Sequence, residues 1–225
     1  MAYGVRLHVW GPRACFTRPE MKVERVSYDV MTPSAARGIL EAVHWKPAIL
    51  WVVDRIHVLR PIRFQSFRRN EVGAKANATL AERGMRAGST AGLGLAVDEA
   101  RQQRATLMLC DVAYLIEAHF ELTARAGESD TPAKHLAMFN RRAAAGQCFH
   151  RPALGCREFA ADFALCPEGA PPPPSTLPAD QRERDLGWML HDIDHAHGAV
   201  SRFFHARLHE GVLDVAACLA EGTAQ

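Results

Sequence analysis

Two Thr-Pro steps stand in the two halves of the chain, and each opens a segment with helical spacing. Thr32 and Thr131 can cap a helix with their hydroxyl groups. Pro33 and Pro132 suit the first helical position, where no backbone N–H is needed. The steps therefore predict two helices that begin alike, and the remaining apolar segments must be arranged around them.

The first helix is expected to end in the turn that contains His44, because Pro47 prevents it from continuing. Its apolar face recurs at helical spacing and consists of Ala36, Ile39, Leu40 and Val43. The second helix is expected to end at Gly146. Its buried face is expected to consist of Leu136, Phe139 and Ala143.

Strand-like segments flank both helices, and their ranges are 5–10, 49–53, 56–67, 107–122 and 158–165. The order β-α-β-β-α-β matches the split βαβ, or ferredoxin-like, arrangement, which RNA-recognition domains share. Extra strands around 14–30 and 107–122 embellish this pattern. We therefore predict an α+β fold whose residues 1–166 form a modified ferredoxin-like (RRM-like) domain.

The rest of the chain divides by composition. Residues 167–185 contain four consecutive prolines at 171–174 and are expected to form an exposed linker. Residues 186–193 and 200–208 read as two strands, which predict a small antiparallel β-sheet domain within 186–225. Residues 70–100 are rich in Gly and Ala without clean periodicity, which indicates a long, partly mobile insertion.

Composition places the chain among ordinary globular proteins. It has 225 residues, of which 48% are hydrophobic and 23% charged, and its net charge of +2 is too small to indicate nucleic acid by itself. No apolar run is long enough for a bilayer and no signal-peptide pattern is present, so we expect a cytoplasmic protein without a membrane partner. The six cysteines form no C-x-x-C pair, and buried thiols are expected rather than disulfides.

A local cluster of basic and aromatic residues is more informative than the net charge. Its members are Arg60, Arg63, Phe64, Phe67, Arg68 and Arg69. Such a cluster combines neutralisation of a phosphate backbone with stacking surfaces, as binding of single-stranded RNA requires. The alternative is a solvated strand edge with core phenylalanines. Lys46, Arg141 and Arg142 are further candidates for contact with RNA.

Three segments resemble one known family. They are Y-D-V-M-T-P-S-A-A-R-G-I-L-E-A-V-H-W-K-P at 28–47, I-R-F-Q-S-F-R-R-N-E-V at 62–72 and D-L-G-W-M-L-H-D-I-D-H at 185–195. The chain is similar to the CRISPR-associated Cas-five family, Dvulg subtype (type I-C), over about 5–215. The resemblance implies an endoribonuclease of antiviral defence that cuts CRISPR precursor RNA within its repeats. It also implies that the protein retains the 5′ handle of the crRNA as a subunit of the type I-C surveillance complex.

The resemblance also implies a catalytic set, namely a Tyr at the end of the first helix and an adjacent Lys-His pair. Lys134 and His135 match the pair, whereas His44 stands where the Tyr is expected. The implied partners are CRISPR repeat RNA, the other subunits of the complex and possibly DNA, and no cofactor is expected. The alternative for Lys134 and His135 is an exposed first turn without function.

These residues suit RNA cleavage by the 2′-hydroxyl, which leaves a 2′,3′-cyclic phosphate and needs no metal. In the predicted topology the end of the first helix lies near the start of the second, which brings His44 towards His135. The helix dipoles favour protonated His44 as general acid and neutral His135 as general base. Lys134 and the free N–H groups of the helix start would hold the phosphate. The opposite assignment of the two histidines stays open.

Two rival functions remain. His191, Asp194, His195 and His197, with Asp192, could ligate a metal, which would indicate a metal-dependent DNA nuclease. On an extended strand the histidines would share one face, but Gly198 suggests a turn, and a polar hairpin tip is the simpler interpretation. The other rival is a non-catalytic subunit that only grips the crRNA handle.

Overall fold

A computed structural model describes residues 4–194 and 197–224, without the side chains of 223 and 224. The chain divides into two compact units. The larger unit comprises the residues up to Gln65 together with those from Leu107 onwards, and the smaller unit is Ser66–Thr106. His195 lies outside the described residues.

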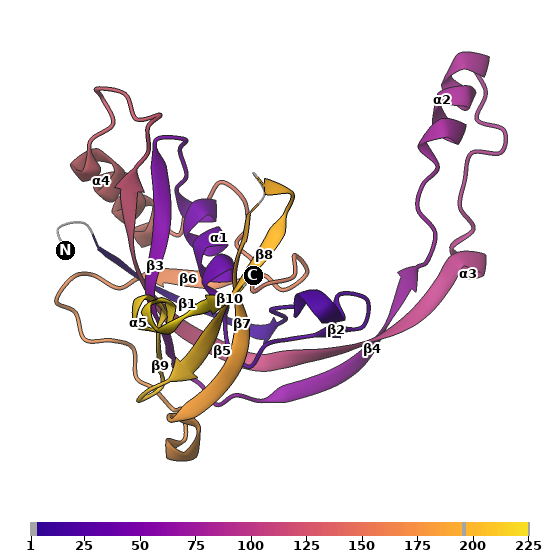
Figure 1. The fold of residues 1–225 in the computed structure, drawn as a ribbon. Coiled ribbons are helices and arrows are strands. Elements are labelled where there is room, and N and C mark those ends of the chain that lie inside the picture. Colours follow the sequence, from indigo (N-terminus) through magenta and orange to yellow (C-terminus); the bar gives the residue numbers. More distant parts are fainter. Residues whose placement is uncertain (1–3, 195–196, 225) are drawn as a thin grey trace. The chain divides into compact units, whose positions relative to one another are not determined.

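The main sheet of the larger unit is antiparallel. Its strands are β1 (Val5–Ala14), β3 (Ile49–Val58), β5 (Arg101–Leu122), β6 (Asp162–Leu165) and β9 (Val212–Asp214), in the order β6-β1-β5-β3-β9 (Figure 1). Two further strands, β2 (Arg25–Val26) and β4 (Phe64–Val72), pair with β5. The central position of β5 between β1 and β3 is that of the third strand in a split βαβ arrangement.

Both predicted helix starts are confirmed. Helix α1 (Pro33–Val43) is capped by Thr32, whose hydroxyl accepts from Ala35 N at 3.2 Å. Helix α4 (Pro132–Ala144) is capped by Thr131, whose hydroxyl accepts from Lys134 N at 3.3 Å. Short 3₁₀ turns cover Pro19–Met21 and Ala179–Gln181. No helix in 4–194 or 197–224 has the length and hydropathy needed to cross a membrane.

The buried face of α4 differs from the predicted one by a single position. His135, Phe139 and Ala143 are buried, whereas Leu136 is only half-buried. The polar His135 therefore takes the inward place that the sequence pattern had given to an apolar side chain. Gly146 follows the helix with φ +65°, as expected for a glycine that ends a helix.

A small antiparallel sheet follows the main one in sequence. It consists of β7 (Arg184–Asp194), β8 (Val200–Leu208) and β10 (Thr223–Ala224), and α5 (Val215–Glu221) lies between β9 and β10 in the chain. Helix α1 contacts both β3 and β7, so it joins the two sheets. The predicted α+β class with a small C-terminal antiparallel sheet is confirmed.

Two polar contacts fix the C-terminal sheet to the region around α1. Leu190 N donates to the buried Tyr28 hydroxyl at 3.2 Å. Arg37, on α1, forms a two-pronged ion pair with Asp192, with Nη2 and Oδ1 2.7 Å apart. The Arg37–Asp192 pair holds α1 against β7, and the Tyr28 hydroxyl holds the segment before α1 against the same strand.

The smaller unit is a hairpin of β4 and the first part of β5 that carries α2 (Ala78–Ala87) and α3 (Val97–Ala100) (Figure 1). Asn77 caps α2 by accepting from Leu80 N at 3.1 Å. The segment predicted as a long insertion without clean periodicity therefore contains two helices. Glycines at 84 and 88 weakened the helical signal, although Gly88 in fact ends α2 with φ +58°.

Other boundaries also differ from the predicted ones. The segments 49–53 and 56–67 were expected as separate strands, but 49–58 is one strand whose register shifts between Val53 and Arg55. A bulge accommodates the polar break at Asp54, which accepts from His119 Nδ1 at 2.9 Å. The closing strand begins at Asp162 rather than 158, and β9 and α5 were not predicted.

The proline-rich segment is not an exposed linker throughout. Ala170 O accepts from Arg6 Nη1 at 2.7 Å, and Thr176 N donates to Leu59 O at 2.8 Å. Leu177 is buried. The segment therefore covers part of the main sheet, because its few free N–H groups find acceptors there while its prolines have none to satisfy.

We predict that Tyr28→Phe lowers the free energy of unfolding by about 1–2 kcal/mol, because the buried Leu190 N–H loses its acceptor. Urea unfolding measures the change, and hydrogen exchange at the Leu190 amide localises it. Stability equal to wild type with unchanged protection of that amide would contradict the proposed contact.

Candidate active site

The ends of α1 and α4 meet at a pair of histidines. His44 forms the C-terminal cap of α1 with an extended backbone, and its N–H donates to Leu40 O at 2.9 Å. His135 lies in the first turn of α4. His44 Nε2 and His135 Nδ1 are 3.0 Å apart and hydrogen-bonded. The predicted approach of these two residues is therefore confirmed.

Aromatic side chains enclose the pair, and each histidine is only 1% exposed. Trp51 of β3 donates from Nε1 to His44 O at 2.8 Å. Phe120 of β5 lies edge-on to the His135 ring, with centroids 6.1 Å apart. Trp51 also packs against Phe139 of α4 at 4.9 Å. Side chains of the main sheet and of α4 thus hold both imidazole rings in place.

Arg142 determines how protons are arranged in the pair. Its Nη1 donates to Val43 O at 3.1 Å and lies 3.5 Å from His44 Nδ1. Because a guanidinium can only donate, His44 Nδ1 is assigned as an acceptor. His44 Nε2–H then donates to His135 Nδ1, and the proton of neutral His135 stands on Nε2. The hydrogen bonds run in one direction, from Arg142 through His44 to His135.

His135 Nε2 is the last atom in this series of hydrogen-bonding groups. It is buried and makes no hydrogen bond to the described residues. It lies 3.2 Å from Asp130 Oδ1. The same oxygen is 3.2 Å from Lys134 Nζ, which also donates to Ser129 O at 3.0 Å. Asp130 thus stands beside both the predicted catalytic lysine and the predicted catalytic histidine.

The sequence analysis missed Asp130. The Gly127 N–H, which donates to the carboxylate, and Lys134 lower the pKa of Asp130. The available signal was its place four residues before Lys134 and directly before the helix cap, where a carboxylate can pair with a lysine of the first turn. The carboxylate of Asp130 is therefore ionised, and it occupies Lys134 Nζ, which an RNA phosphate would otherwise contact.

The pKa of His44 is lowered from 6.5 to about 4. Burial is the largest cause of this shift, and the nearby Arg142, His135 and Lys46 also contribute to it. The prediction that the helix dipole keeps His44 protonated is therefore wrong. A helix C-terminus contributes about 1 kcal/mol to a nearby cation. Desolvation in an aromatic enclosure and two basic neighbours outweigh that contribution.

Exposed aromatic and basic side chains surround this enclosure. Trp45 directly follows His44 and is 54% exposed, and Phe149 is 90% exposed. Phe149 N donates to Ala42 O at 2.8 Å, which fixes its backbone beside the end of α1. Of the basic residues predicted for RNA contact, Lys46 and Arg141 are exposed, whereas Arg142 is half-buried against His44. The two aromatic residues were not predicted.

The other predicted RNA-binding residues lie elsewhere. Arg60 and Arg63 both pair with Asp111, at 3.0 Å for Arg63. Both arginines follow β3, whereas His44 precedes it, and a strand of ten residues spans about 30 Å. Phe64 is 38% exposed in the larger unit. The smaller unit contains Phe67, Arg68 and Arg69.

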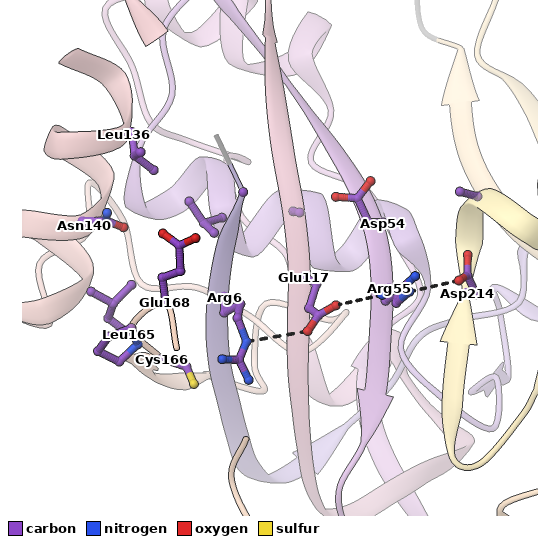
Figure 2. Close-up of a pocket in the computed structure, with 15 residues that line it drawn as sticks. Arg6, Asp54, Arg55, Glu117, Leu136, Asn140, Leu165, Cys166, Glu168 and Asp214 are labelled. Carbon is purple, nitrogen blue, oxygen red and sulfur yellow. Dashed lines mark hydrogen bonds and ion pairs between the residues drawn. The ribbon is translucent and has the colours of Figure 1, made fainter. Parts of the chain in front are cut away.

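A pocket of about 420 Å³ is found apart from the histidine pair. Figure 2 shows Arg6, Glu117 and Arg55 on neighbouring strands, with Arg55 directed towards Asp214. Arg55 Nε and Asp214 Oδ2 are 3.0 Å apart. Carboxylate side chains outnumber cationic ones in the lining of this pocket, so the pocket is poorly suited to a phosphate backbone. The pocket therefore does not compete with the histidine pair as a nuclease site.

The histidine-rich segment does not assemble a metal site in the part of the chain that is described, where no group of three or more ligating side chains occurs. Asp192 pairs with Arg37, and Asp194 pairs with Arg202 and with His197 Nδ1 at 3.0 Å. His191 packs edge-on against Phe204. The proposed ligand His195 lies outside the described residues.

A crystal structure of a CRISPR-associated protein shares this fold, with a TM-score of 0.68 at 23% identity over 99% of this chain and 96% of the other. The CRISPR pre-crRNA endoribonuclease Cas5d of Mannheimia succiniciproducens is 57% identical over 221 residues, which cover 98% of each protein. The CRISPR pre-crRNA endoribonuclease Cas5d of Thermus thermophilus is 41% identical over 232 residues, 95% of this chain and 91% of that protein.

A family model described as CRISPR-associated protein (Cas_Cas5), of the Cas5d group, matches residues 4–216. The match spans the main sheet, both Thr-Pro helices and the two long strands of the C-terminal sheet. The chain belongs to the Cas5d family of CRISPR-associated proteins.

Proposed function

We propose that this chain is an endoribonuclease that cuts CRISPR precursor RNA within its repeats without a metal, by attack of the 2′-hydroxyl. The names of the two relatives support the substrate and the reaction class. The observation that carries the proposal is the His44–His135 hydrogen bond beside Lys134. His135 and Lys134 both lie at the start of α4, where they would supply the proton-transfer group and the cation.

His135 transfers the proton in this proposal, first as base and then as acid. Nε2 carries a hydrogen at rest, so for catalysis the ring takes the other tautomer, in which Nδ1–H donates to His44 Nε2. His135 Nε2 then takes the proton of the 2′-hydroxyl and returns it to the leaving 5′-oxygen.

His135 Nε2 is the ring atom that no described residue engages by a hydrogen bond, and Lys134 Nζ shares Asp130 Oδ1 with it. A scissile phosphate that displaces Asp130 would meet both groups at once. The ammonium group of Lys134 then stabilises the charge of the phosphorane. The backbone N–H groups of Lys134 and His135 are already bonded to Thr131, so they do not share in this role at rest.

His44 orients His135 rather than acting as the acid. Its low pKa keeps the imidazole neutral at physiological pH. Its neutral ring, hydrogen-bonded to His135 Nδ1, fixes the plane of the His135 ring, as partner groups do for catalytic histidines. This role replaces the acid role expected from the helix dipole, and it favours His135 in the proton-transfer step.

Binding of the RNA involves separate surfaces in this proposal. Trp45 and Lys46 directly follow His44, and the backbone of Phe149 is bonded to Ala42 at the end of α1. These exposed side chains, together with exposed Arg141 of α4, would contact a single strand at the cut.

Arg60, Arg63 and Phe64 of the larger unit would hold the retained 5′ handle, and Phe67, Arg68 and Arg69 of the smaller unit would contact RNA separately. The modified ferredoxin-like (RRM-like) architecture supports this division, because RNA-recognition domains also bind single strands on such a fold.

A second candidate function is a non-catalytic subunit of the type I-C surveillance complex that binds the crRNA handle. The burial of His44 and His135, each 1% exposed, favours this candidate because substrate must displace Asp130 before it reaches His135. Both candidates keep the RNA bound after any cut, so cleavage itself distinguishes them.

We predict that Lys134→Ala and His135→Ala each slow cleavage of a cognate repeat RNA by about 100-fold or more in the presence of a chelator. RNA binding should change far less than the rate. Matched controls are Lys22→Ala and His209→Ala, which remove an exposed lysine and an exposed histidine outside the site. Wild-type rates in both test variants would exclude the site, and binding without cleavage by wild type would favour the handle-binding subunit.

We predict that the RNA products end in a 2′,3′-cyclic phosphate, because the attacking oxygen belongs to the substrate. Mass spectrometry of the 5′ fragment, with and without chelator, measures the end group. A 3′-hydroxyl made only with divalent ions would instead indicate a metal-dependent nuclease.

The neutral state of His44 has a separate consequence for stability. Its folded pKa of about 4 lies below the reference value of 6.5, so the unfolded chain takes up the proton first as pH falls. We predict that this group reduces the free energy of unfolding by about 2 kcal/mol between pH 7 and pH 5, and that the loss is absent above pH 7.

Urea unfolding at a series of pH values tests this prediction by comparison of wild type with His44→Gln and His44→Phe. Both variants lack the titrating ring, so their stability should depend less steeply on pH than that of wild type. Parallel pH profiles for all three proteins would show that His44 keeps an ordinary pKa.

A further inference from the structure

Two cysteines far apart in sequence meet outside the candidate active site. Cys15 Sγ and Cys156 Sγ each lie 3.5 Å from the hydroxyl oxygen of Thr17. Cys15 is fully buried at the end of β1, and Cys156 is half-exposed in the loop between α4 and β6. A buried thiol and an accessible thiol therefore face one shared hydroxyl group.

The backbone forces the two cysteines together. Cys15 N donates to Leu154 O at 3.0 Å, and Cys15 and Gly155 form a parallel β-bridge. Gly155 has φ +83°, and a Cβ at this position would come within 2.0 Å of Cys15 O. Only glycine permits so close an approach. The neighbouring Cys156 is thereby held beside Cys15 by main-chain contacts rather than by loose side-chain packing.

The surroundings of Cys156 favour its thiolate. Its sulfur accepts from Arg25 Nη1 at 3.5 Å, and Arg25 is held in turn by Glu158 at 2.7 Å. Hydrogen bonding to Cys15, then Thr17 and Arg25, lowers the pKa of Cys156, although burial and Glu158 act the other way. The same thiol contact and burial raise the pKa of Cys15. Cys15 therefore stays protonated while Cys156 ionises.

We propose that Cys156 and Cys15 form a redox-active thiol pair that reacts with low-molecular-weight disulfides and closes to an intramolecular disulfide bond. An exposed thiolate beside a buried, protonated partner is the arrangement that thiol–disulfide exchange uses, with one nucleophilic and one resolving cysteine. The other four cysteines are not needed for this exchange.

The exchange proceeds in two balanced steps. The Cys156 thiolate attacks one sulfur of the small disulfide, which forms a mixed disulfide and releases one small thiolate. Cys15 passes its proton to that thiolate and attacks the Cys156 sulfur, which breaks the mixed disulfide and releases the second small thiolate. Two protein thiols are oxidised and one disulfide is reduced to two thiols.

Closure would link the end of β1 to the loop between α4 and β6. These two segments are already paired through Leu154 and Gly155, so the bond can form with little movement of the backbone. The expected consequence is a higher melting temperature of the oxidised protein, because the link closes a long segment of the unfolded chain.

Incubation of the purified full chain with oxidised glutathione, followed by acid quenching and peptide mapping, tests the proposal. Wild type should lose two hydrogens and yield one linked peptide pair containing Cys15 and Cys156. Cys15→Ser should instead keep glutathione on Cys156. The matched control Cys148→Ser removes another half-buried thiol and should close as wild type does.

Alkylation rates as a function of pH supply a measurement that does not depend on closure. In wild type, Cys156 should react about 10-fold faster than Cys148 at pH 7, because only Cys156 has cationic and hydroxyl donors around its sulfur. Arg25→Ala keeps both thiols and should slow Cys156 several-fold. No linked peptide, or equal reaction at Cys110, Cys148 and Cys156, would overturn the proposal.

Discussion

The hydrogen bond between two buried imidazoles holds the candidate site together. It joins residues that lie 91 positions apart and belong to different helices. A buried polar ring without a partner is costly, so each histidine depends on the other for its place in the interior. The bond also requires α1 to end, and α4 to begin, at one edge of the main sheet. The Thr-Pro caps and the enclosing Trp51 and Phe120 make that arrangement possible.

Charge is distributed around this bond in a definite order. Arg142 stands at the His44 end, whereas Asp130 and Lys134 stand at the His135 end. The arginine, which can only donate, is bonded to the first imidazole, and the carboxylate lies beside both the lysine and the second imidazole. In the proposed function, an RNA phosphate would replace this carboxylate beside the lysine, so one negative group would be exchanged for another.

Local signals in the sequence predicted the helices that begin with a cap and the strands in which apolar and polar residues alternate over many positions. The convergence of His44 with His135 followed from two such caps in a βαββαβ order. The protonation state of His44 did not follow, because Trp51 and Arg142 approach this residue only in the folded chain. The strand β9 is three residues long and carries no periodic pattern of its own. Asp130 was overlooked because it precedes the cap rather than lying within the helix.

The position of α1 between two sheets has a mechanical consequence. Arg37, in the N-terminal half of the helix, forms an ion pair with Asp192, and His44 caps the C-terminal end. A hydrogen-bonded helix of 11 residues behaves as a stiff rod, so a pull on one end is conveyed along its axis. A displacement of the C-terminal sheet would therefore be transmitted along α1 to the end that carries His44. The helix connects the C-terminal sheet with the buried pair of imidazoles.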